Sequence, residues 1–168
     1  MENETVFIVG CARTGSTLLR DLLNKSDRIC LASETHFLRR MSHIGLWKRI
    51  RKFGDLSDDR NVEKLVRYLY GAIDRGEKTY WSWLLKTVDS PVFTQRLLAT
   101  DRSDRAIFTL LMQLYAEQKR GVVTPDLILG EKTPTHLYYV PTLFEWYPRA
   151  KVIHTFRDPR GIFVLSLI

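Results

Sequence analysis

Residues 10–17, which read G-C-A-R-T-G-S-T, have the composition and spacing of a loop that binds phosphate or sulfate. The stretch follows an apolar run and leads into a helical pattern, so the helix N–H groups and positive dipole end would point at a bound anion. A nucleotide triphosphatase loop carries lysine where this chain has Ser16, and Arg13 inside the loop supplies a cation instead. These residues indicate an anion site poorly suited to ATP hydrolysis; the alternative is an ordinary glycine-bounded turn.

Three further segments carry side chains that could bind an anion or accept a proton. Residues 33–37 read S-E-T-H-F, residues 130–136 read G-E-K-T-P-T-H, and residues 157–160 read R-D-P-R after a strand-like run. Carboxylate and imidazole groups serve as general bases, and lysine and arginine stabilise developing negative charge. Asp158 followed by proline also marks a helix start, because aspartate caps a helix and proline fits its first turn.

Strands and helices of recognisable periodicity must position these side chains. Strand-like runs lie at residues 5–9, 28–31, 126–129 and 151–156, and the first is apolar enough to be buried on both faces of a parallel sheet. From residue 34 to about residue 121 the pattern is helical. Its apolar stripes are Phe37, Met41, Ile44, Trp47 and Ile50, then Val62, Leu65, Val66, Leu69 and Ile73, then Ile107, Leu110, Leu111 and Leu114 after a cap at Ser103.

This order of elements predicts an α/β fold: a P-loop-like, mainly parallel sheet flanked by helices, with a long helical insertion after the second strand. A last helical stretch before residue 151 contains Pro141, which either kinks that helix or starts it. We expect one domain over residues 1–168, apparently truncated at its C-terminus. The apolar helix that begins at Asp158 reaches Ile168 without a polar final turn.

The composition is that of an ordinary globular protein. The 168 residues are 45% hydrophobic and 27% charged, with a net charge of +7, which excludes a disordered or fibrous chain and favours an anionic partner. No uncharged apolar stretch approaches the about 20 residues of a membrane span, and no signal peptide is visible. Cys11 and Cys30 form no disulfide framework, so we expect a cytoplasmic protein.

Together, the four motifs resemble those of the sulfotransferases that use 3′-phosphoadenosine 5′-phosphosulfate (PAPS). The family's 5′-phosphosulfate loop contains lysine or arginine, glycine, two serines or threonines and two leucines, and residues 12–19 lack only its first proline. Residues 130–134 resemble the G-E-K-T-P segment of bacterial and carbohydrate-directed members, and residues 33–37 resemble the stretch after the family's second strand. Residues 152–160 resemble its 3′-phosphate segment, and all four motifs occur in the family's order.

The resemblance implies which residues bind PAPS. The loop would hold the 5′-phosphosulfate through N–H, hydroxyl and guanidinium groups of Arg13, Thr14, Gly15, Ser16 and Thr17. Arg157 would bind the 3′-phosphate; the alternative is a surface ion pair with Asp158 or Glu131. The family's serine partner normally lies eight positions later, where this chain has Leu165, and the candidate here is Ser166 at position nine. One residue turns a helical side chain by about 100°.

The resemblance also implies residues for the chemistry. Lys132, with Arg13, would stabilise charge on the leaving phosphate oxygen, although a lysine at a strand end can also be merely solvated. Glu34 matches the carboxylate that acts as general base in members such as the tyrosylprotein sulfotransferases. His136 and His36 rank second and third as bases. No residues have metal-ligand spacing, so we expect no metal.

The implied reaction transfers a sulfuryl group from PAPS to a hydroxyl, or an amine, of a small-molecule, carbohydrate or peptide acceptor. One alternative is a non-catalytic module that binds PAPS or another anion. A P-loop kinase is a weaker alternative, because the lysine and a strand-end acid for magnesium are missing. Basic residues cluster without a recognised nucleic-acid motif, so we expect no nucleic-acid partner. The sequence leaves the acceptor and the oligomeric state open.

Overall fold

The computed structural model describes residues 4–38, 46–75 and 81–160. Its contacts divide the chain into two compact units, one of residues 1–35 with 119–168 and the other of residues 36–118. Each unit is considered by itself below, and the single domain expected over residues 1–168 stays a prediction.

In the first unit, the described strands form a four-stranded sheet in the order β2-β3-β1-β4, with all neighbours parallel. The strands are β1 (Thr5–Gly10), β2 (Ile29–Ala32), β3 (Ile128–Lys132) and β4 (Lys151–Thr155). The α/β class and the parallel sheet are therefore confirmed. The third strand lies later than predicted, because a turn from Thr124 to Leu127 precedes it and its polar end stays in the ladder, with Lys132 opposite Ile8.

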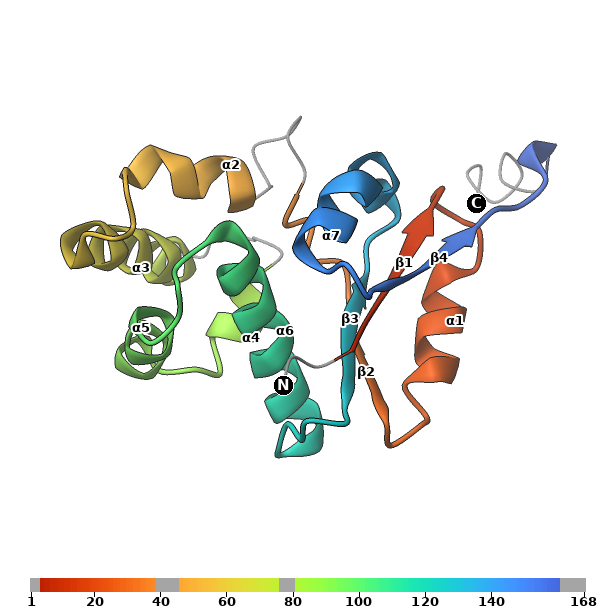
Figure 1. The fold of residues 1–168 in the computed structure, drawn as a ribbon, viewed down its shortest axis with the longest axis horizontal. Coiled ribbons are helices and arrows are strands. Elements are labelled where there is room, and N and C mark those ends of the chain that lie inside the picture. Colours follow the sequence, from red (N-terminus) through yellow and green to blue (C-terminus); the bar gives the residue numbers. More distant parts are fainter. Residues whose placement is uncertain (1–3, 39–45, 76–80, 161–168) are drawn as a thin grey trace. The chain divides into compact units, whose positions relative to one another are not determined.

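Two crossover connections cover opposite faces of this sheet. Helix α1 (Ser16–Leu23) joins β1 to β2, while η2 (Pro134–Tyr139) and α7 (Val140–Trp146) join β3 to β4. The two connections run in opposite directions along the sheet, so right-handed crossovers put them on different sides, as Figure 1 shows for α1 and α7. Phe7, Ile8 and Val9 are consequently at most 1% exposed. Pro141 lies in the first turn of α7, so it starts this helix rather than kinking it.

The outer edge of β2 is closed by side chains rather than by another strand. Asn24 accepts a hydrogen bond from the Leu31 N–H at 2.7 Å and donates to the Leu31 carbonyl at 2.9 Å. The Ile29 N–H donates to the Ser26 carbonyl at 3.3 Å, and Arg120 donates to the Ile29 carbonyl at 3.0 Å. Ile29 and Leu31 are the residues that face away from β3 in this alternating ladder, so the outward backbone groups of β2 are paired.

Helices make up the described part of the second unit: α2 (Leu46–Ile50), η1 (Arg51–Phe53), α3 (Asp59–Asp74), α4 (Ser82–Leu85), α5 (Ser90–Leu98) and α6 (Asp104–Arg120), whose last two residues are assigned to the first unit. Ser103 caps α6, since its hydroxyl accepts from the Ala106 N–H at 3.1 Å. The predicted helix start at residue 34 is wrong: residues 33–38 are not helical, and Met41 and Ile44 lie outside the described residues. Most of the second predicted stripe is buried in α3.

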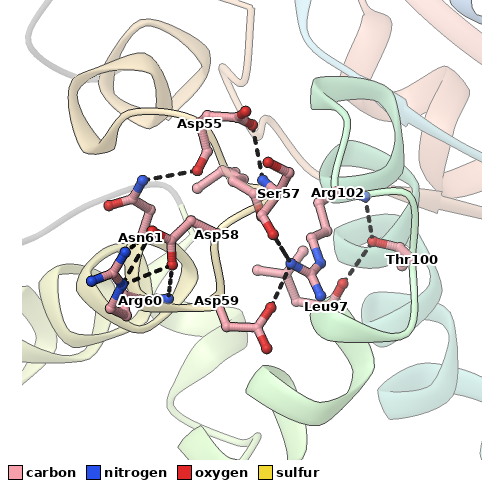
Figure 2. Close-up of polar contacts among 10 residues, drawn as sticks. Asp55, Ser57, Asp58, Asp59, Arg60, Asn61, Leu97, Thr100 and Arg102 are labelled. Carbon is pink, nitrogen blue, oxygen red and sulfur yellow. Dashed lines mark hydrogen bonds and ion pairs between the residues drawn. The ribbon is translucent and has the colours of Figure 1, made fainter.

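Arg102 ties the residues before α3 to the turn between α5 and α6 (Figure 2). Its guanidinium donates to the carbonyls of Leu56 and Ser57 at 3.0 and 2.9 Å and pairs with Asp59 at 2.6 Å. Asp58 caps α3 by accepting the Arg60 N–H at 2.9 Å. These polar contacts fix the start of α3 within the helical unit.

The closed edge of β2 leads to a prediction on stability. Asn24→Ala removes both partners of Leu31, whose N–H and carbonyl are buried, so the free energy of unfolding should fall by about 1–3 kcal/mol. Asn24→Asp keeps the acceptor and loses the donor, and should be intermediate. Urea denaturation of the three proteins measures the series. An Asn24→Ala protein as stable as the wild type would contradict the role given to this side chain.

Candidate functional site

The parallel sheet brings most of the predicted site residues to one edge. The loop of residues 10–17 follows β1, Glu34 follows β2, Lys132 ends β3, and Arg157 follows β4. Parallel strands end at the same edge, so these four segments are neighbours although up to about 140 residues separate them in sequence. Ser166 lies outside the described residues, and His36 belongs to the helical unit.

The loop after β1 requires glycine at its first position. Gly10 has φ +145°, and a Cβ there would lie 2.1 Å from the Thr155 carbonyl oxygen. Gly15, with φ +87°, precedes α1 without a side-chain cap, and its carbonyl accepts the Leu19 N–H at 3.0 Å. The first-turn N–H groups of α1 therefore have no capping side chain at Gly15, which is the condition for an anion at a helix start.

Two threonines connect this loop to the end of β4. The hydroxyls of Thr14 and Thr155 lie 2.8 Å apart, and Thr14 donates to the Cys11 carbonyl at 2.8 Å. Thr155 is two residues before Arg157, and Arg13 is next to Thr14. The contact between the two threonines therefore holds the segment that carries Arg13 against the segment that carries Arg157.

Among the described residues, neither of the two arginines has a carboxylate partner that would compete with an anion. Arg13 and Arg157 are both exposed, and neither pairs with a carboxylate within residues 4–38, 46–75 and 81–160. The two partners considered for Arg157 are engaged elsewhere: Asp158 pairs with Arg160 at 2.6 Å, and Glu131 pairs with His136. Asp158 also caps the helical turn that follows by accepting the Arg160 N–H at 2.9 Å. The surface ion pair proposed as the alternative for Arg157 is therefore absent from the described residues.

Glu34 and Lys132 meet at the same edge. The Lys132 ammonium donates to Glu34 Oε1, so a predicted base and a predicted cation are in direct contact. Only 4% of the Lys132 side chain is exposed, against 35% of the Glu34 side chain. The aliphatic stem of the lysine is thus enclosed, while the carboxylate can still meet a molecule that arrives from solvent.

A second carboxylate lies behind this pair. Glu131 is 1% exposed; its Oε1 lies 2.5 Å from His136 Nδ1, and its Oε2 accepts from the hydroxyl and, at 3.3 Å, the backbone N–H of Thr35. Burial alone would raise the pKa of the Glu131 carboxyl, but His136 and the hydrogen bonds from Thr35 and Thr133 outweigh it and lower this pKa. Glu131 is therefore an ionised group held in the interior by dedicated partners.

The two histidines considered as bases are both enclosed. His136 is 1% exposed, and the turn that carries it begins at Thr133, whose carbonyl accepts the His136 N–H at 2.9 Å. This turn brings the imidazole back onto Glu131. His36 is 5% exposed and has φ +49°. Of the three predicted bases, Glu34 is the one with a substantially exposed side chain.

The residues that hold the site together were not singled out from the sequence. Thr155 and Thr35 act across long sequence distances, with partners at Thr14 and Glu131. Glu131 stood inside a quoted motif, two positions beyond the run predicted as a strand, and nothing local marked it as a buried residue. Among the described residues, no group of three His, Cys, Asp or Glu could hold a metal ion. Within the same ranges, no helix is long and apolar enough to cross a bilayer.

The buried carboxylate predicts a specific acid sensitivity. Because the folded-state pKa of Glu131 lies below its ordinary value of 4.5, ionised Glu131 contributes stability that is complete above that pH and is lost as the pH falls through the lowered pKa. The free energy of unfolding should therefore fall more steeply below pH 4.5 in the wild type than in Glu131→Gln. Urea denaturation across this pH range measures both slopes, with exposed Glu145→Gln as control. Parallel slopes in the wild type and Glu131→Gln would contradict the assignment.

Comparison with known proteins agrees with this arrangement. A model of the Sulfotransferase family matches residues 5–167. Two curated relatives, the omega-hydroxy-beta-dihydromenaquinone-9 sulfotransferases Stf3 of Mycobacterium bovis and Mycobacterium tuberculosis, are each 26% identical over 183 residues. The match covers 94% of this chain and 43% of each relative, so the chain spans less than half the length of these relatives. Because the family match extends over nearly all of the chain, this protein belongs to the sulfotransferase family.

Proposed function

We propose that the protein transfers a sulfuryl group from PAPS to the hydroxyl, or amine, of an acceptor. One observation carries the proposal: a phosphate-type loop, two arginines without a described carboxylate partner, and the contact between Glu34 and Lys132 share the carboxyl edge of one parallel sheet. A donor with phosphate at two positions and a transferable sulfuryl group matches this set of side chains. The 5′-phosphosulfate and the 3′-phosphate of PAPS would each be bound by a different group of residues.

Arg13 and the start of α1 suit the 5′-phosphosulfate. The loop supplies backbone N–H groups, the hydroxyls of Ser16 and Thr17, and one guanidinium, all of which favour an anionic oxygen. Thr14 keeps the loop against β4. Arg157, two residues beyond Thr155, is then the cation assigned to the 3′-phosphate, which distinguishes PAPS from ATP.

Glu34 and Lys132 suit the transfer itself. Glu34 would take the proton from the acceptor hydroxyl as its oxygen attacks sulfur, and the bond between sulfur and the bridging phosphate oxygen would break. Lys132 and Arg13 would stabilise the charge left on that oxygen, so the products are a sulfate ester and adenosine 3′,5′-bisphosphate. For this, Lys132 must exchange its contact with Glu34 for one with the donor, which leaves the carboxylate free to accept a proton. The burial of His136 and His36 supports Glu34 as the base.

The acceptor is proposed at the level of chemical class. The two relatives are named for action on omega-hydroxy-beta-dihydromenaquinone-9, which carries a hydroxyl on a small lipid molecule. We therefore rank hydroxylated small molecules above carbohydrates and peptides as acceptors. The cytoplasmic setting remains an expectation from the sequence.

The donor assignment predicts nucleotide selectivity. Adenosine 3′,5′-bisphosphate should raise the melting temperature more than ATP with magnesium, because Ser16 replaces the lysine that ATP-hydrolysing loops use. It should also bind about tenfold or more tightly than adenosine 5′-monophosphate, since a charge-assisted phosphate contact is worth about 1.5–3 kcal/mol. Arg157→Ala should abolish that difference in affinity, while Arg13→Ala should weaken the binding of both nucleotides. Calorimetric titration measures these constants.

The matched control for this experiment is Arg160→Ala, which removes a nearby exposed arginine that already pairs with Asp158. It should leave the preference for the bisphosphate intact. If ATP with magnesium stabilises the protein more than the bisphosphate, the donor assignment is wrong.

The base assignment predicts a loss of turnover without a loss of donor binding. In the full-length protein, Glu34→Gln keeps the shape of the side chain but removes the proton acceptor, so kcat should fall by about 10²–10⁴-fold. The affinity for adenosine 3′,5′-bisphosphate should change little. Steady-state rates over a panel of hydroxylated acceptors measure the effect. A fully active Glu34→Gln enzyme would transfer the role to His136, and bound donor with no transfer to any acceptor would favour the non-catalytic module.

A further inference from the structure

The segments that carry Glu34 and Lys132 are joined by a second set of contacts on the other side of β3. Glu131 and Lys132 are successive residues of an extended strand, so their side chains point to opposite faces of the sheet. Lys132 contacts Glu34, and Glu131 contacts Thr35, the next residue along the chain. Two neighbouring residues after β2 are thus bound to two neighbouring residues at the end of β3.

The hydroxyl and the backbone N–H of Thr35 both have buried partners. Its hydroxyl donates to Glu131 Oε2, and its backbone N–H lies 3.3 Å from that oxygen and 3.2 Å from the Thr133 hydroxyl. Thr35 is 8% exposed and Thr133 is 1% exposed, so water cannot readily substitute for these partners. One peptide unit separates this fixed backbone from the α-carbon of Glu34.

His136 completes the arrangement from the far side of Glu131. Its Nδ1 lies 2.5 Å from Glu131 Oε1, which leaves Oε2 directed at Thr35. A carboxylate with His136 close to one oxygen and Thr35 donating to the other has a restricted orientation, whereas an apolar residue of similar size would fill the space without holding Thr35. A buried ionised group is costly to the fold, and fixing a geometry is one use that offsets this cost.

We propose that Glu131 is a positioning residue: held by His136, it fixes Thr35 and thereby sets the Glu34 carboxylate opposite the Lys132 ammonium. The proposal rests on the proposed function of Glu34 and Lys132. Glu131 does not touch the reacting atoms in this role. Catalytic groups must be held within about 0.5 Å of their working positions, and a misplacement of about 1 Å can cost about 10²-fold in rate.

The test removes one contact of Glu131 and leaves Glu131 and His136 themselves in place. Thr35→Val removes the hydroxyl that Glu131 binds and keeps the side-chain shape, while Thr35→Ser keeps the hydroxyl. Thr5→Val is the matched control, because Thr5 is similarly buried at 6% but lies at the opposite end of β1. Two readouts are measured in the full-length protein: kcat and KM for PAPS, and the rate at which acetic anhydride acetylates Lys132, followed by peptide mass spectrometry.

Thr35→Val should lower kcat by about 10–100-fold with little change in KM for PAPS. It should also make Lys132 react several times faster with acetic anhydride, approaching the rate in Glu34→Gln, where the ion pair is removed directly. Thr35→Ser should recover most of the lost turnover. Melting temperatures of Thr35→Val and Thr5→Val should fall similarly, while only Thr35→Val changes kcat and Lys132 reactivity.

The proposal is overturned if kcat in Thr35→Val falls no further than in Thr5→Val, whatever happens to Lys132. It is also overturned if kcat falls while Lys132 reactivity stays at the wild-type value, since the loss would then have another cause. If the wild type transfers no sulfuryl group to any acceptor, the proposed function fails, and the acetylation rates alone decide the positioning: faster reaction in Thr35→Val supports it, and an unchanged rate overturns it.

Discussion

The site depends on one constraint, the parallel direction of neighbouring strands. Parallel strands deliver their carboxyl ends to the same edge, and the crossovers that this requires cover both faces of the sheet. Gly10, Ala32, Lys132 and Thr155 end the described strands, and every described residue assigned to the site in the first unit follows or occupies one of these ends. An antiparallel partner at any position would send one of the motifs to the opposite edge.

The charges at this edge fall into two classes that differ in solvation. Arg13 and Arg157 are exposed cations without a described carboxylate partner, so their field extends into solvent and attracts anions. Glu131 is enclosed, with His136 beside one carboxylate oxygen and Thr35 donating to the other, so its charge is held away from solvent. The contact between Glu34 and Lys132 lies between these classes, with one enclosed and one accessible partner. A ligand can therefore disturb this pair while the buried one stays fixed.

The sequence predicted the features that depend on local pattern. The apolar run at residues 5–9 became β1, Ser103 became a helix cap, and the start predicted at Asp158 has the expected capping bond. Prediction from the sequence failed where a distant residue decides the local conformation. Residues 33–38 follow a helical apolar spacing, but Thr35 is bound to Glu131, almost one hundred positions away, and this segment is not helical.

The same limit applies to the site. Arg13, Glu34, Lys132 and Arg157 were recognisable because motifs carry them, and the sheet brings their segments together. The threonine contact between the loop and β4 has no local signal, because neither Thr14 nor Thr155 is unusual in its own segment. The order of the strands, which makes these residues neighbours, is a property of the whole chain.

The side chains that occupy the outer face of β2 have a consequence for association between molecules. An open strand edge is a template on which another chain can add a strand, and this route leads to aggregation. Asn24 and Arg120 already occupy the hydrogen-bonding positions that an incoming strand would need at Leu31 and Ile29. Growth of the described sheet by strand addition is therefore blocked at the β2 edge, so association through this edge would require Asn24 and Arg120 to give up their contacts.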